Sequence, residues 1–314
     1  MPKVITPAVL DAIFQSFNFS FQQAFAGVEP QWSRVAMEVN SQAAAENYGW
    51  LGQMPRMREW IGDRVIKSLD AFGYQIPNKT FESTLTLKRE QIEDDSYGLF
   101  RPFVSDMGRS VALFPDELIY PLLKNGFAAN CFDGQYFFDT DHPVKDADGK
   151  DQPVANMIDG AGPAWFLLDA SRAVKPLVYQ KRRAFEFVAK TNPNTSDRVW
   201  LANEYLYGVD GRCNAGYGLW QLAFGSKAAL NRANLRAAYQ AMTTLKGDYG
   251  RPLGIKPTVL VCGPSLQSTA RDLLNAELLP VNGVPGGVVN ENAIGMISNT
   301  DKGLVDLLVS PWLD

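Results

Sequence analysis

Apolar residues recur at helical spacing near the start of the chain. Between residues 7 and 26 they stand three or four positions apart, at Leu10, Phe14, Phe17, Phe21 and Phe25. This spacing predicts an amphipathic helix with one aromatic face. Such a face needs a surface to lie against, which can be the protein's own core or a neighbouring molecule reached by a loose N-terminal arm. We keep both interpretations and take Phe14, Phe17 and Phe21 as candidate contacts with a neighbour.

A long irregular stretch, residues 48–78, is followed by alternation with a period of two. In residues 80–87, Phe81, Leu85 and Leu87 share one face while threonines and Glu82 take the other, as in a half-buried strand. Long loops without structure of their own tend to be functional or disordered, and the aromatic content argues against disorder. We predict an extended loop or hairpin closing on this strand. Its candidate contact residues, which another surface should cover, are Trp50, Met54, Met57 and Trp60.

The longest periodic signal lies between residues 99 and 122. One apolar seam runs through Leu99, Phe103, Met107, Val111, Phe114, Leu118 and Leu122. The seam predicts one long helix, with Pro115 removing a hydrogen bond and kinking it and Gly126 as its stop signal.

The rest of the chain mixes helical and strand patterns without regular alternation. Residues 131–162 are turn-rich, and short β-like segments follow between 164 and 211. An amphipathic helix is expected at about 227–246, a strand, a Gly-Pro turn and a helix at 258–276, and closing strands in AIGMIS and LVDLLVS. The predicted fold class is therefore α+β.

Composition and charge reduce the number of function classes to consider. The chain has 314 residues, 46% of them hydrophobic, and a formal charge of -4, so tight DNA binding through a basic face is not expected. The basic run at 181–183 is either solvated or a weak contact to DNA. The three cysteines, Cys131, Cys213 and Cys262, show no disulfide or zinc spacing and are expected to be buried thiols. No secretion signal or membrane-spanning run is visible, so we expect a cytosolic protein without membrane contact.

The single histidine, His142, stands beside Asp139 and Asp141 in DTDHP. These three residues could hold a metal, but Asp and His before Pro favour a turn, and no second acidic motif supports a metal site. No nucleophile elbow, Walker A loop or dinucleotide fingerprint is present. We expect no enzyme activity, no metal and no cofactor, and keep a metal-dependent hydrolase as a third alternative.

Three stretches of the sequence resemble one family closely. They are NYGWLGQMPRMREWIGDRVIKSL, YQIPNKTFESTLTLKREQIEDDSYGLF and YFFDTDHPV. They look like the Mu-like prophage major head subunit, often called gpT, and the resemblance spans essentially the whole chain. It implies the Hong Kong 97 (HK97) type of major capsid fold.

The resemblance also implies a division of the chain. An N-terminal arm would occupy 1–47, an extended E-loop 48–90, and a peripheral domain 91–185, with its spine helix at about 95–125. An axial domain would fill 186–299, and the last strand, in 300–314, would return to the peripheral domain.

The implied function is a structural capsid protein that self-assembles, as pentamers and hexamers, into an icosahedral shell around double-stranded phage DNA. The protein would be found in the virion, and in the host cytoplasm during assembly. A scaffold protein, expected to be separate because the chain begins almost directly with the arm, a maturation protease and a portal would be its partners. DNA contact would be weak and non-specific. The alternative is an encapsulin-like nanocompartment shell that packages protein cargo.

Opposite charges flank the predicted E-loop. Arg56 and Arg58 stand near its start, and Glu93, Asp94 and Asp95 stand just before the spine helix, close to Glu90. Arginine binds carboxylates bidentately, so the arginines of one subunit are expected to meet the acidic group of its neighbour. The competing interpretation is that both groups are solvated and that the acids favour the helix start electrostatically.

Overall fold

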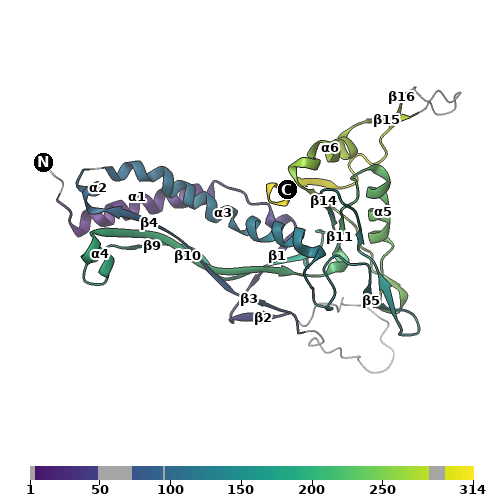
Figure 1. Cartoon of the computed structure of the whole chain (residues 1–314), viewed down its shortest axis with the longest axis horizontal. Helices are drawn as coiled ribbons and strands as arrows, with labels where there is room; N and C mark the ends of the chain where they lie inside the picture. The colour runs from purple at the N-terminus through teal and green to yellow at the C-terminus, as the bar shows by residue number, and fades with distance from the viewer. Residues whose placement is uncertain (1–3, 49–72, 95, 283–293) are drawn as a thin grey trace.

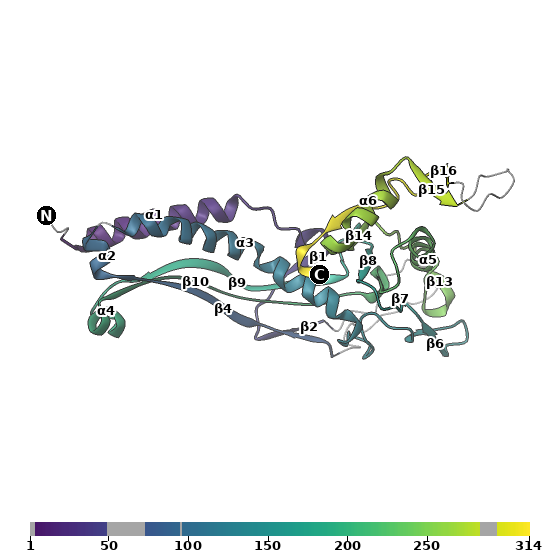
Figure 2. The same ribbon diagram turned by 45° about the horizontal axis from the view of Figure 1, so that its top comes forward.

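The computed structural model describes residues 4–48, 73–94, 96–282 and 294–314. The molecule has an elongated half and a compact lobe at one end, from which a narrow two-stranded arm projects (Figure 1). The elongated half contains α1 (Pro7–Ala26), α3 (Arg101–Lys124) and a long sheet. The two helices run side by side along one face of that sheet in both views (Figures 1 and 2).

Four strands form the long sheet, in the order β1-β9-β10-β4. Their bounds are β1 Ala36–Asn40, β4 Lys79–Lys88, β9 Leu177–Lys190 and β10 Glu204–Tyr217. Only the β1–β9 pair is parallel. The predicted face of β4 is confirmed, since Leu87 is buried, Phe81 and Leu85 are half-buried, and the threonines between them are exposed. The short segments expected between 176 and 211 are instead parts of two strands of 14 residues each.

Helix α1 confirms the first prediction. Thr6 caps its start by accepting a hydrogen bond from the Val9 amide, and Pro7 occupies the first turn, where no amide proton is needed. Its buried face consists of Leu10, Ile13, Phe17 and Phe21. This face belongs to a hydrophobic core that also contains residues of β4, β9 and β10, namely Leu87, Phe187, Tyr205, Tyr207 and Val209.

Helix α3 lies in the segment where the apolar seam predicted a helix, but its buried face is rotated from the predicted one. Leu99 and Phe103 are 79% and 70% exposed, and the buried positions are Val104, Gly108, Val111, Ala112, Pro115, Asp116, Ile119, Tyr120 and Leu123. Gly108 lies at the contact with α1, where a side chain would collide with the backbone of Phe21. The helix continues past Pro115 and Pro121, and the chain then turns through Gly126.

The compact lobe is built on a five-stranded sheet of order β17-β14-β8-β11-β7. The strands are β7 Met157–Ile158, β8 Trp165–Leu168, β11 Ala223–Ser226, β14 Val259–Cys262 and β17 Asp306–Val309. Every residue of β8, β11 and β14 is buried, as expected for central strands. Two helices, α5 Arg232–Thr243 and α6 Gln267–Asn275, complete the lobe, and the predicted strand, Gly-Pro turn and helix correspond to β14, Gly263-Pro264 and α6.

Smaller elements decorate both parts. They are the helices α2 Arg89–Glu93 and α4 Asp197–Ala202 and the strand pairs β2 Ala45–Asn47 with β3 Gln75–Pro77, β5 His142–Lys145 with β6 Asp151–Val154, β12 Lys246–Gly247 with β13 Arg251–Pro252, and β15 Leu278–Asn282 with β16 Ile294–Ser298. The last pair forms the projecting arm in Figure 1. No described helix combines the length and apolar character needed to cross a membrane.

Two of the predicted borders do not follow the observed sheets. The border at residue 186 falls inside β9, and β10, assigned to the axial domain, pairs with β4 and β9 in the long sheet. The border at 186 is what the family resemblance implies, and β9 continues across it from Leu177 to Lys190. The strand predicted in 300–314, β17, joins the five-stranded sheet beside β14, and the turn after it, Pro311–Leu313, lies against α3.

The excursion from residue 48 to residue 74 begins and ends at one place. The pair β2–β3 closes it, and the Tyr48 amide donates to the Tyr74 carbonyl at 2.8 Å. Below this closure, buried Gln180 accepts from the Tyr48 hydroxyl at 2.8 Å and donates to the Ile76 carbonyl and the Asn78 side chain. Gln180 of β9 therefore holds both ends of this excursion, which lies inside the predicted E-loop of 48–90.

Candidate assembly surfaces and the His142 cluster

The aromatic face of α1 is used inside the subunit. Phe17 meets Tyr207 edge-on at 5.3 Å between ring centroids, and Phe21 stacks on Phe187 at 5.2 Å. Both phenylalanines are buried, so their interpretation as contacts with a neighbour is wrong. Phe14 also stacks on Phe187, at 5.8 Å, but keeps a half-exposed edge. The interpretation that the helix packs on its own core holds for this face.

Other large apolar side chains remain uncovered in the described part of the subunit. Five strongly exposed ones on the elongated half are Phe19, Leu99, Phe103, Trp200 and Leu201. A folded monomer rarely leaves several such residues in water, and uncovered apolar groups mark interaction surfaces. None of these five was nominated from the sequence. For Trp200 and Leu201 the signal was present, since VWLAN cannot bury all its apolar residues in a six-residue helix.

Trp200 and Leu201 form a knob at the far end of the molecule, on α4 in the connection between β9 and β10 (Figure 1). They are 71% and 80% exposed. Buried Val199 anchors the helix from below, and Asn203 ends it in the left-handed conformation. The short helix thus holds both side chains outward.

The acidic group before α3 is only partly described. Glu93 forms an ion pair within α2, accepting from Arg89 Nε at 2.8 Å, so this carboxylate already has a partner in its own subunit. Asp94 is exposed and follows α2 directly. Asp95 lies outside the described residues, as do Trp50, Met54, Arg56, Met57, Arg58 and Trp60.

The three side chains of the basic run on β9 have partners within the subunit. Lys181 Nζ lies 3.4 Å from Glu38, Arg183 pairs with Asp210, and Arg182 donates to the Ser41 carbonyl. The two carboxylates offset the charges of Lys181 and Arg183, whereas the carbonyl is neutral and leaves the charge of Arg182.

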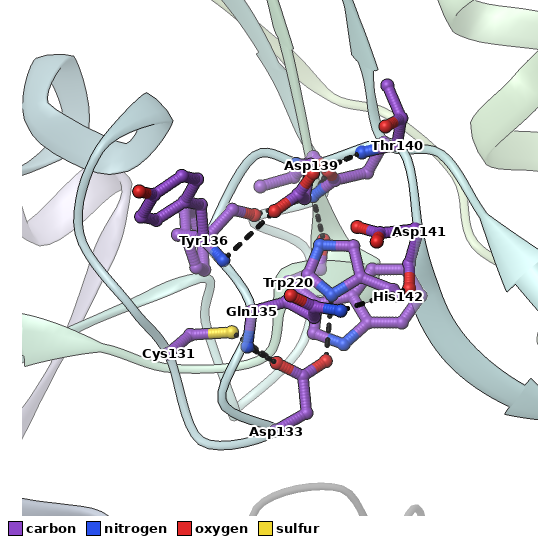
Figure 3. Close-up of polar contacts among 12 residues, drawn as sticks. Cys131, Asp133, Gln135, Tyr136, Asp139, Thr140, Asp141, His142 and Trp220 are labelled. Carbon is purple, nitrogen blue, oxygen red and sulfur yellow. Dashed lines mark hydrogen bonds and ion pairs between the residues drawn. The ribbon is translucent and has the colours of Figure 1, made fainter.

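A polar cluster is buried where the turn after α3 meets β5; we call Cys131, Asp133, His142 and Trp220 the His142 cluster. His142 Nδ1 lies 2.7 Å from Asp133 Oδ2, and the Cys131 thiol donates to Asp133 Oδ1 at 3.0 Å. The imidazole stacks on Trp220 with 3.9 Å between ring centroids and 10° between planes. Figure 3 shows the carboxylate between thiol and imidazole. His142 is the first residue of β5 and fully buried, so its interpretation as a turn residue is wrong.

Burial and hydrogen bonding set the protonation of this cluster. Burial alone would raise the pKa of Asp133, but hydrogen bonds from His142 and Cys131 outweigh it and lower that pKa. Burial and the Asp133 charge raise the pKa of Cys131 well above that of a free thiol, so this cysteine is no activated nucleophile.

The predicted hydrolase trio is not assembled. The His142 ring points inward to Asp133, whereas Asp139 accepts from the amides of Tyr136 and Thr140, and exposed Asp141 hydrogen-bonds to Asp139. That contact raises the pKa of Asp141. Neither carboxylate shares a site with the imidazole (Figure 3).

Comparison with known proteins gives consistent matches over the full chain. Residues 10–313 match the family described as Mu-like prophage major head subunit gpT. The chain is 41% identical to the major capsid protein of Escherichia phage Mu, over 99% of this chain and all of that protein. It is 40% identical to the Mu-like prophage FluMu major head subunit of Haemophilus influenzae, over 89% of this chain and 93% of that one.

Solved phage shells contain the same fold. A chain in the procapsid of bacteriophage JBD30 matches with a TM-score of 0.80 and 44% identity, over 98% of this chain and all of that chain. A chain in the JBD30 capsid matches with a TM-score of 0.73 and 34% identity, over 99% and 100%. This chain therefore belongs to the Mu-like prophage major head subunit family, whose members are structural capsid proteins of the HK97 fold type and not enzymes.

Proposed function

We propose that this subunit assembles through pentamers and hexamers into an icosahedral shell that encloses the double-stranded DNA of a Mu-like phage. The observation that supports this most directly is the near-complete coverage of both the Mu capsid protein and a JBD30 shell chain. A nanocompartment shell would need a cargo protein, and the named relatives are phage heads.

Within this proposal the elongated half is the peripheral domain and the compact lobe is the axial domain. Residues 1–47 supply the N-terminal arm and 48–90 the E-loop. The long hairpin β9–β10 belongs with α3 in the peripheral domain, since both strands lie under that helix. The axial domain then begins after β10 and also includes β7 and β8.

Assembly in the host cytoplasm is proposed to require a separate scaffold protein, a maturation protease and a portal. Packaged DNA would touch the shell weakly, because the net charge is -4 and Lys181 and Arg183 of the basic run on β9 are already paired. Stability of the shell would come from repeated contacts between subunits rather than from any single strong one.

Electron microscopy of the protein expressed with and without its scaffold tests the proposal. Alone, the purified subunit is expected as a monomer or small oligomer, and with the scaffold it is expected to form closed shells. A subunit that stays monomeric under every such condition contradicts the proposal. Shells filled with one host protein and no DNA after infection would favour the nanocompartment instead.

The charge pairing proposed between neighbours has its own test. Arg58→Glu is expected to impair assembly, and adding Asp94→Arg or Asp95→Arg is expected to recover part of the loss. Single exposed pairs contribute only about 0–1 kcal/mol, so the effect depends on repetition across the shell and should weaken with salt. If neither double variant assembles better than Arg58→Glu alone, these charges do not meet.

A further inference from the structure

The His142 cluster brings together three kinds of metal-binding atom in the interior of the compact lobe. A thiol sulfur, a carboxylate oxygen and an imidazole nitrogen, from Cys131, Asp133 and His142, all lie within 4.8 Å of one another. We propose that these three side chains bind one divalent transition-metal ion of the zinc class, which ties the turn after α3 to β5.

The set of donors fits such an ion. Zinc takes cysteine sulfur, histidine nitrogen and aspartate oxygen, at about 2.3 Å, 2.0–2.1 Å and 2.0–2.2 Å respectively. Tetrahedral bonds of this length place two donors about 3.5 Å apart. The three donor atoms lie within 4.8 Å of one another, somewhat wider than this spacing, so a small rotation of the side chains brings them to one ion. Three protein ligands leave the fourth position to a water molecule.

Charge balance favours the ion as well. The cluster contains a carboxylate, that of Asp133, on a side chain that is only 6% exposed. On binding, the thiol proton passes to the solvent, and the thiolate and carboxylate together balance the two positive charges of the metal, so that the metal-bound cluster with a neutral imidazole carries no net charge.

The surroundings favour a structural ion over a catalytic one. Trp220 covers one face of the imidazole, and both Cys131 and His142 are buried. The carboxylate already gathers the other two groups through its hydrogen bonds, at 2.7 and 3.0 Å, so the site is largely assembled before the metal arrives. Nδ1 of His142 faces the carboxylate and is the coordinating atom, while its buried Nε2 has no hydrogen-bond partner in the described structure.

Cobalt(II) titration of the metal-stripped full-length protein is the test. We expect absorption from a thiolate bound to cobalt that saturates near one ion per chain and is abolished by added Zn²⁺. Cys131→Ser and Asp133→Asn should weaken binding at least about tenfold, the loss that follows even when a residue supporting a ligand is changed. Cys262→Ala, which alters another buried thiol, is the matched control and should bind as the parent does.

Thermal unfolding provides a second measurement that does not depend on variants folding well. Zn²⁺ should raise the Tm of the unaltered protein, because an ion that binds only the folded state stabilises it. Absence of both the thiolate absorption and the Tm increase overturns the proposal and leaves a purely hydrogen-bonded cluster. Absorption that persists in Cys131→Ser, or that disappears in Cys262→Ala, also overturns it. Neither measurement depends on shell assembly, so failure here says nothing against the capsid function.

Discussion

His142 is buried and stacked on Trp220, although its neighbours in sequence favour a turn. Its partners, Asp133 and Trp220, are 9 and 78 residues away, and local turn statistics contain no information on either. The role of His142 was therefore inferred from its neighbours in sequence, which are not the residues that it contacts. The same gap in information affects Cys131, whose burial was predicted but whose hydrogen bond to Asp133 was not.

Replacing His142 with Ala is expected to destabilise the subunit by about 2–4 kcal/mol, since it leaves a cavity beside Trp220 and removes a hydrogen bond from a buried carboxylate. This effect is larger than the modest one that a turn residue would give. Urea unfolding of the unassembled subunit measures it, with Asp141→Ala as an exposed control expected within about 0.5 kcal/mol of the parent. Equal stability of the two variants would contradict the buried stacking.

Asp116 joins the N-terminal arm to α3, and its protonation should affect stability. Its carboxylate accepts from the amides of Gln31 and Trp32 at 3.1 and 2.6 Å, yet burial dominates and raises its pKa. The folded subunit thus holds this proton to higher pH than the unfolded chain does. The resulting stabilisation is complete below the unfolded pKa, about 3.9, and is lost as the pH rises through the folded pKa.

The pH dependence of unfolding, measured for the parent and for Asp116→Asn between about pH 3 and pH 7, isolates this contribution. The parent is expected to lose stability relative to the variant as the pH rises. A parent that instead gains relative stability over this range would show that hydrogen bonding, and not burial, controls Asp116.

Among the elements, the contact of α1 with α3 depends on one small residue. A methyl group at Gly108 would collide with the Phe21 carbonyl, so the two helices approach as closely as they do because glycine stands there. Gly108→Ala is expected to cost about 1–3 kcal/mol through overpacking, although alanine is the better helix former. Unfolding of the subunit tests this, with Gly98→Ala, where an added methyl meets no atom, as the matched control. A stabilised Gly108→Ala subunit would contradict the close contact.

Helices and strand faces were well predicted where the pattern reports burial within one chain. α1, the face of β4, and the β14–α6 unit all appeared as expected. The seam of α3 was rotated because Leu99 and Phe103, which set its phase, are apolar and yet face outward. Periodicity assumes that apolar residues face their own core, and a capsid subunit violates this assumption. The long strand β9 was divided into two short segments because the charged residues 181–183 in its middle look like a loop.

At the scale of the whole molecule, the tip of the elongated half exposes two large apolar side chains. Trp200 and Leu201 stand at the far tip of the elongated half, supported by the subunit but not used by its core. Replacing both with Ser is expected to change the unfolding free energy by no more than about 0.5 kcal/mol, as for other exposed positions. Shell yield with scaffold, counted by electron microscopy, should nevertheless fall sharply, because apolar and aromatic anchors dominate binding at interfaces.

Lys190→Ala, an exposed change in the same hairpin, is the control and should assemble normally. Normal shells from the double Ser variant would show that the knob is not covered by another subunit. Loss of subunit stability in that variant would show that the knob serves the monomer after all.

The hydrogen bond between Tyr48 and Tyr74 brings together the two ends of the excursion that contains residues 49–72, which we call the side branch. The chain leaves and re-enters the described structure at one backbone hydrogen bond, between the Tyr48 amide and the Tyr74 carbonyl, and Gln180 holds both sides of it. The entropy of closing such a branch grows only slowly with its length. A foreign peptide inserted into it should therefore leave the subunit folded, which makes this branch the natural place to display a sequence or to vary the shell without redesigning the subunit that carries it.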